Sequence, residues 1–151
     1  EHFYLPVVFS NTLLTGAMTV IRDTHDCVIT QQKDAAELTT TAEYDWRFLT
    51  PIRVIDVNDN IQAVTMDALG RVTTLRFCGT ESGVITGYSD AKMDIPESAE
   101  AALAFVAPLP VTQCIVYVTD SWVRPGAEKL PPHVVTLSTD RYDSDNKQQI
   151  R

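Results

Sequence analysis

The sequence predicts an all-β domain, an antiparallel β-sandwich or barrel of about nine or ten strands with at most one short helix. The β-branched residues are abundant, because 18 Thr, 16 Val and 9 Ile make up 43 of the 151 residues, and such residues favour strands. The strong helix former Lys occurs only 4 times. Segments rich in Val, Ile, Thr and aromatic residues recur about every ten residues between turn residues, which is typical of sandwiches and barrels.

The first third of the chain predicts several strands and one polar loop. Residues 3–9 predict a strand, and residues 18–22 and 27–31 predict a hairpin whose polar connection lies between them. Residues 31–43 are polar and contain three consecutive threonines, which argue against a long helix, so we predict a loop there with at most one turn. The aromatic alternation of residues 44–48 predicts the core face of a strand.

The central region, residues 53–78, predicts a three-stranded meander. Its strands are residues 53–57, 61–66 and 71–78, separated by Asn58-Asp59-Asn60 and by residues 67–70. Asn and Asp tolerate left-handed backbone conformations and bond their own main chain, so both breaks predict turns. Neither alternating set of residues 71–78 is purely apolar, which predicts a face that is only partly buried.

The last third predicts three further strands and the one helix. Strands are expected at residues 84–88, 114–123 and 134–139. The proline and acidic residues before the alanine-rich stretch that begins at Ala99 predict a short helix start. The polar residues 141–151 predict a frayed end.

Composition excludes several functional classes. The formal net charge is -8, and no Lys or Arg cluster exists that would neutralise a phosphate backbone, so we predict no nucleic-acid partner. No apolar run approaches the roughly 18 residues of a membrane span, and we predict no membrane insertion. We detect no internal repeat and no dividing linker, which predicts a single domain over residues 1–151. Because strand-like sequence begins directly after Glu1, we interpret the chain as a C-terminal fragment of a longer polypeptide.

Cysteine usage predicts a reducing compartment. The three cysteines, Cys27, Cys78 and Cys114, are odd in number and lack CxxC spacing, so no disulfide framework is expected. All lie in apolar runs, which predicts small buried side chains. None of the asparagines begins a glycosylation acceptor.

One short motif could bind a cation. The stretch Asp56-Val57-Asn58-Asp59-Asn60 resembles the calcium-binding DxNDN linker of cadherin repeats. Closely spaced carboxylate and amide oxygens are the ligands that Ca²⁺ prefers. The resemblance implies that Asp56, Asn58 and Asp59 are candidate calcium ligands, although Gln62 stands where that family has a proline. The alternative is a tight β-turn without a metal ion or any other cofactor.

No complete catalytic constellation is visible, so we predict that the chain is not an enzyme. His25 is flanked by Asp23 and Asp26 and is the one histidine that could act as a base in a hydrolase-like β-domain. Residues 79–83 place Ser82 at the wrong position for a nucleophile elbow. A solvated turn is the alternative interpretation of His25.

The residue types that dominate interface hot spots lie near predicted strand ends. These candidate partner-binding residues are Tyr88, Trp122 and Arg124. The alternative is that the aromatic residues form the edge of the core.

The whole profile, an acidic β-rich domain with free cysteines and no catalytic motif, resembles the protruding domains of coat proteins of small non-enveloped RNA viruses, insect viruses among them. The resemblance implies a capsid surface domain on the virion, assembled in the host cytoplasm. Its partners would be a host receptor or glycan and other copies of itself in a dimeric or trimeric spike. A calcium-dependent or carbohydrate-binding adhesion module and a hydrolase that uses His25 are the alternatives. The resemblance assigns no functional residue.

Overall fold

The computed structural model describes residues 4–13, 15–81, 84–88, 94–106, 108–123, 125 and 129–151. Its elements are β1 (Val8–Ser10), β2 (Ala17–Arg22), β3 (Ile29–Lys33), β4 (Thr39–Asp45), β5 (Thr50–Ile55), β6 (Ile61–Met66), β7 (Val72–Glu81), β8 (Val84–Gly87), α1 (Ala99–Leu103), β9 (Gln113–Val118) and β10 (His133–Ser138). The predicted all-β antiparallel fold of nine or ten strands with one short helix is confirmed. The described strands do not close into a barrel, because β1 and β10 end the strand order.

The chain divides into two compact units. The meander unit comprises Glu1–Ala63 with Gly79–Val84, and the core unit comprises Val64–Cys78 with Ile85–Arg151. No helix in the described part of the chain is long and apolar enough to cross a membrane.

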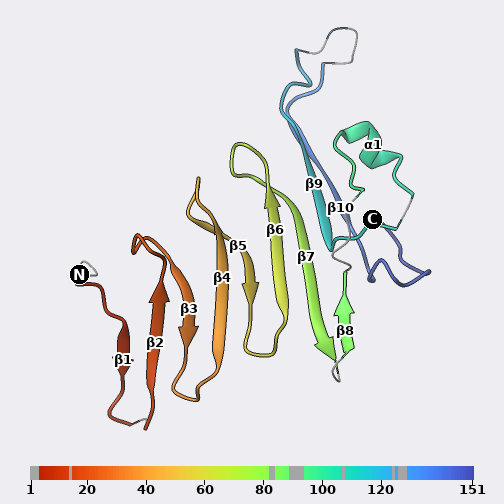
Figure 1. Cartoon of the computed structure of the whole chain (residues 1–151). Coiled ribbons are helices and arrows are strands. Elements are labelled where there is room, and N and C mark those ends of the chain that lie inside the picture. The colour runs from red at the N-terminus through yellow and green to blue at the C-terminus, as the bar shows by residue number, and fades with distance from the viewer. Residues whose placement is uncertain are drawn as a thin grey trace. The chain divides into compact units, whose positions relative to one another are not determined.

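The meander unit is a series of antiparallel hairpins in which each strand from β1 to β6 pairs with the next one in sequence (Figure 1). The predicted hairpin of residues 18–31 is confirmed as β2 and β3. The loop predicted for residues 31–43 is wrong, because these residues form the β3–β4 hairpin. Thr39, Thr40 and Thr41 lie in β4, where their branched side chains suit an extended backbone.

Five turns share one structure that recurs every 11 residues. In each turn the carbonyl of an Asp accepts the N–H three residues later, and its carboxylate accepts the N–H two residues later. These residues are Asp23, Asp34, Asp45, Asp56 and Asp67. A positive φ follows three residues after four of them, at Asp26, Glu37, Asp59 and Gly70, and four residues after Asp45, at Leu49. The expectation of no internal repeat is therefore wrong at the level of the turns.

The core unit builds its sheet from β7, β9 and β10 and places α1 beside it. Thr74 of β7 lies opposite Cys114 of β9, which in turn lies opposite Leu137 of β10. Buried residues pack together here, namely Ala102, Leu109, Val111, Cys114, Val116 and Leu137. The predicted helix is confirmed, since the Ser98 hydroxyl caps α1 by accepting the N–H of Ala101 at 3.1 Å.

The polar C-terminal stretch is ordered, and the prediction that residues 141–151 fray is wrong. The Gln148 amide accepts the Leu109 N–H at 2.8 Å and donates to the Leu109 carbonyl at 2.9 Å. Ile150 packs against the core and forms an antiparallel bridge with Thr139. Gln148 thus anchors this stretch, because its side chain forms hydrogen bonds with both backbone groups of the buried Leu109. Hydropathy alone does not reveal this contact.

Candidate functional site

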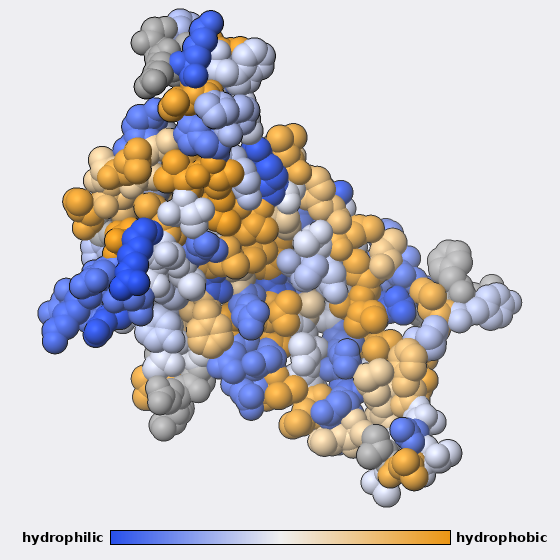
Figure 2. Space-filling model, turned by 180° about the vertical axis from the view of Figure 1, so that it is seen from behind, coloured by the Kyte–Doolittle hydropathy of each residue, from blue (hydrophilic) through white to orange (hydrophobic). Residues whose placement is uncertain are grey.

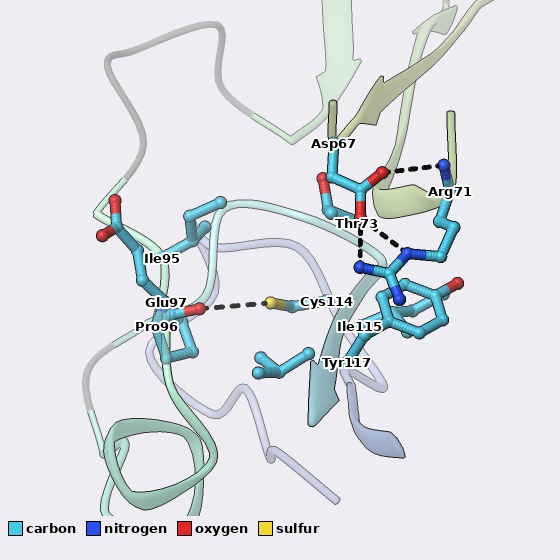
Figure 3. A pocket seen from close by; sticks show the side chains of 10 residues that line it. Asp67, Arg71, Thr73, Ile95, Pro96, Glu97, Cys114, Ile115 and Tyr117 are labelled. Carbon is cyan, nitrogen blue, oxygen red and sulfur yellow. Dashed lines mark hydrogen bonds and ion pairs between the residues drawn. The ribbon is translucent and has the colours of Figure 1, made fainter. Parts of the chain in front are cut away.

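A pocket of about 330 Å³ lies within the core unit. Three segments line it: the β6–β7 turn with Asp67 and Arg71, the extended stretch before α1 with Pro96 and Glu97, and the β9 strand (Figure 3). The Asp-capped turn fixes the first wall, and the ladder between β7 and β9 fixes the third.

The charged wall of this pocket is internally neutralised. Arg71 donates from Nε to Asp67 Oδ2 at 2.7 Å and from its terminal nitrogen to the same oxygen at 2.6 Å. The guanidinium also lies over the Tyr117 ring, with 4.4 Å from Cζ to the ring centroid. Burial raises the pKa of Asp67, but the hydrogen bonds from Arg71 and Leu69 outweigh it and leave the pKa below its ordinary value.

The thiol at the pocket is unreactive by its environment. Cys114 is 2% exposed, and its Sγ lies 3.9 Å from the Pro96 carbonyl, toward which it points (Figure 3). Burial raises the pKa of this thiol, and the thiol form is a poor nucleophile. The geometry therefore offers a hollow lined by an ion pair and an aromatic ring.

The calcium candidates lie on the β5–β6 turn. Asp56 Oδ1 accepts the N–H groups of Asn58 at 2.8 Å and Asn60 at 2.9 Å, and Oδ2 accepts the Asn60 side-chain amide at 2.9 Å. Both carboxylate oxygens therefore hold the turn together. Among the described residues no group of three or more His, Cys, Asp or Glu side chains is placed to hold a metal ion. Calcium binding at Asp56, Asn58 and Asp59 stays a prediction.

His25 lies on the β2–β3 turn and is largely exposed. Its Nδ1 is 2.9 Å from the Thr24 hydroxyl, and its backbone N–H donates to Asp23 Oδ2 at 2.8 Å. The Cys27 Sγ donates to the His25 carbonyl rather than to the ring. The ring therefore faces solvent beside a turn, with the Thr24 hydroxyl and, at 3.8 Å, the Asp23 carboxylate next to its Nδ1.

Of the three candidate partner-binding residues, the structure describes Tyr88 and Trp122. Tyr88 is 5% exposed, its hydroxyl bonds Thr139 and the Arg141 carbonyl, and its ring meets Tyr142 edge-on at 5.2 Å. These contacts pack Tyr88 within the core unit, and its role in partner binding stays a prediction. Trp122 is 57% exposed in a turn, and Arg124 lies outside the described residues.

Sequence reasoning predicted the turns at residues 58–60 and 67–70 but missed the 11-residue recurrence of the Asp-capped turn and the Arg71 cation–π contact. The first left a signal, because an acidic residue every 11 positions is visible in the printed sequence. The second left none, because Arg71 and Tyr117 are 46 positions apart.

No protein-family model and no curated protein matches the chain. A crystal structure of TcdB2–TccC3 matches at 53% identity and a TM-score of 0.88 over 99% of this chain. A structure of TcdB2–TccC3–Cdc42 matches at 40% identity with the same TM-score and coverage. A Tc holotoxin pore of Photorhabdus luminescens with a TccC3 mutation matches at 39% identity and a TM-score of 0.86 over 98% of the chain.

The chain is similar to a segment of a Tc toxin. It spans only 7% of the matched TcdB2–TccC3 chain and 9% of the matched holotoxin chain. The viral interpretation is therefore wrong in its family, its capsid function and its virion location, because 53% identity over 99% of the chain points to a bacterial toxin complex. The profile that suggested a protruding domain was shared composition and strand spacing, which unrelated β proteins also have.

Proposed function

We propose that this chain is a structural β-sheet segment of a much larger Tc toxin protein and works by packing against other parts of that toxin. The single observation that carries the proposal is the match over 99% of this chain at 53% identity to a protein of which it covers 7%. At this identity the matched segment has the same fold, and its place in the larger chain is the simplest account of its role.

The burial pattern of the meander unit supports this role. Among its described residues only Val20 and Val28 are buried hydrophobic side chains. Large apolar residues reach the surface instead, including Phe9 at 41%, Ile21 at 55% and Trp46 at 58% exposure. Figure 2 shows hydrophobic residues interspersed with polar ones on the visible face of the molecule. A sheet normally buries one face against another layer, so we infer that other toxin segments supply that layer.

The proposed function implies that the partners of this chain are proteins. The matched structures are of complexes, namely TcdB2–TccC3 with Cdc42 and a Tc holotoxin pore. We infer that the full-length protein takes part in an assembly of this kind. Of the predicted partners, association with other protein chains is thereby retained. A host receptor or glycan stays a prediction that this function does not require.

A segment exchange tests the proposal. The matched segment of TcdB2–TccC3 is replaced with this chain, and soluble yield and incorporation into the holotoxin are measured by size exclusion and electron microscopy. We expect assembly comparable to the parent. The matched control carries Leu109→Asp within the exchanged segment and is expected to fail, because Leu109 is 0% exposed.

The isolated chain provides the second arm of the test. We expect it to bind a hydrophobic dye and to self-associate, because its exposed apolar side chains lack their cover. A chimera that does not assemble, together with an isolated chain that is a dye-negative monomer, would overturn the proposal.

A further inference from the structure

The outer edge of β10 carries backbone groups that no described strand pairs. Ser138 exchanges both backbone hydrogen bonds with Arg151, at 2.8 Å and 2.9 Å, whereas the Thr139 N–H points the other way, to Thr112 of the β9 side. Backbone groups of successive strand residues point alternately to the two edges. The N–H and C=O groups of Thr136 and Val134 therefore point to the same edge as those of Ser138.

The composition of β10 is that of a covered strand. Its six residues, His133–Ser138, include no Lys, Arg, Asp, Glu or Pro, and Val134 is 52% exposed. Natural edge strands are protected by charges, prolines, bulges or short length. The strand β1 shows that protection, since it has only three residues. The strand β10 has six residues and carries no charge or proline within them, because Pro131 and Pro132 stand only before its first residue.

The chain already begins to cover this edge. After the turn at Asp145, Gln149 accepts the Asp140 N–H, Ile150 bridges Thr139 and Arg151 pairs with Ser138. This register is antiparallel and steps along β10 toward His133. It places the first residue after Arg151 opposite Leu137 and the third opposite Val135.

We propose that, in the full-length protein, the polypeptide that follows Arg151 forms an eleventh strand on the outer edge of β10, in the register set by Ser138 and Arg151. The proposal rests on the proposed function, because it requires the chain to be part of the longer protein. The strand supplies partners for the Thr136 and Val134 backbone and covers the exposed Val134 side chain. The occupant of this edge is thus a segment of the same polypeptide.

Disulfide crosslinking in the full-length protein tests the register. In a Cys27→Ala, Cys78→Ala background, Val135→Cys is combined with a cysteine at the third residue after Arg151. This pair is of the non-hydrogen-bonded type, whose Cα atoms lie about 4.5 Å apart, within disulfide reach. We expect an intramolecular disulfide on mild oxidation. Matched controls carry the second cysteine one position earlier or later, so that its side chain points to the opposite face of the sheet. We expect these controls to stay reduced.

A second pair of variants reports on the backbone. Thr136→Pro removes an outward N–H, so we expect little change in Tm in the chain that ends at Arg151 and a clear decrease in the full-length protein, each relative to Thr136→Ala. Folding of every variant is checked by circular dichroism.

The outcomes separate the two proposals. Folded full-length variants that crosslink in no register, or equally in all three, would remove the eleventh strand. If Val135→Cys in the chain ending at Arg151 forms crosslinked dimers, a second copy of the chain binds the β10 edge. That result would also overturn the eleventh strand. An exchange chimera that assembles while the crosslink is absent leaves the proposed function intact, whereas a natural protein that ends at Arg151 removes both.

Discussion

The meander unit and the core unit are built from the same kind of strand, yet they bury very different numbers of apolar side chains. Two buried hydrophobic residues lie in the described part of the meander unit, Val20 and Val28, whereas nine lie in that of the core unit. The meander unit instead holds four of the five Asp-capped turns, those of Asp23, Asp34, Asp45 and Asp56. Local turn chemistry can therefore specify strand order where packing does not, and the core unit is the part stabilised by its own interior.

The two units should differ most in the unfolding free energy that is lost when one apolar side chain is truncated in each. Leu109→Ala in the core unit removes a side chain that is 0% exposed, and we expect it to lower the free energy of unfolding by about 2–5 kcal/mol. Ile21→Ala in the meander unit removes a side chain that is 55% exposed, and we expect a change within about 0.5 kcal/mol. Urea denaturation measures both. Equal losses would show that the meander unit also depends on packing.

The next effect concerns the turns. Asp56→Ala removes the acceptor of two backbone N–H groups and one side-chain amide, so we expect a loss of stability smaller than that of Leu109→Ala and larger than that of Ile21→Ala. Asn58→Ala is the matched control in the same turn, because Asn58 contributes its backbone N–H rather than its side chain to this network. Thermal unfolding ranks the variants. An Asp56→Ala protein as stable as the Asn58→Ala protein would show that the Asp-capped turn is dispensable.

Acid should weaken the turns before it affects the apolar core. The pKa values of Asp23, Asp45 and Asp56 are lowered, chiefly by hydrogen bonds from Val28, from the Arg47 side chain and from the Asn60 side chain, respectively. A folded-state pKa below the unfolded value stabilises the protein fully above the unfolded value, 3.8, and the contribution is lost as the pH falls through the lower folded value. We therefore expect stability to fall below about pH 4.

The control for this pH dependence is Asp56→Asn, which retains an oxygen acceptor but cannot titrate. Unfolding free energy measured from pH 6 to pH 2.5 should fall less steeply for this variant than for the parent. Parallel profiles would contradict the assignment of the acid sensitivity to the turn carboxylates.

The fold was predictable from the sequence to the extent that it is local. Strand propensity and Asn or Asp turns predicted the β5–β6–β7 meander, and the proline and acidic residues before Ala99 predicted α1. The loop predicted for residues 31–43 is wrong because the three threonines argue against a helix without excluding a strand, which their β-branching favours. The ordered end was missed because the Gln148–Leu109 hydrogen bonds join residues 39 positions apart. The toxin similarity could not follow from composition, since no single residue pattern carries it.

The smallest expected effect is at the core-unit pocket. Tyr117→Leu keeps an apolar side chain on β9 but removes the ring that lies under the Arg71 guanidinium, and cation–π pairs at partly exposed sites contribute about 0.5–1 kcal/mol. Arg71 is 33% exposed and keeps its ion pair with Asp67 in this variant, so we expect a loss within that range. A double-mutant cycle with Arg71→Gln isolates the contact, because removing Arg71 should cost less when Tyr117 is already gone. Additive losses in urea denaturation would mean that the ring and the guanidinium contribute independently, and that the pocket wall is held by the Asp67 turn alone.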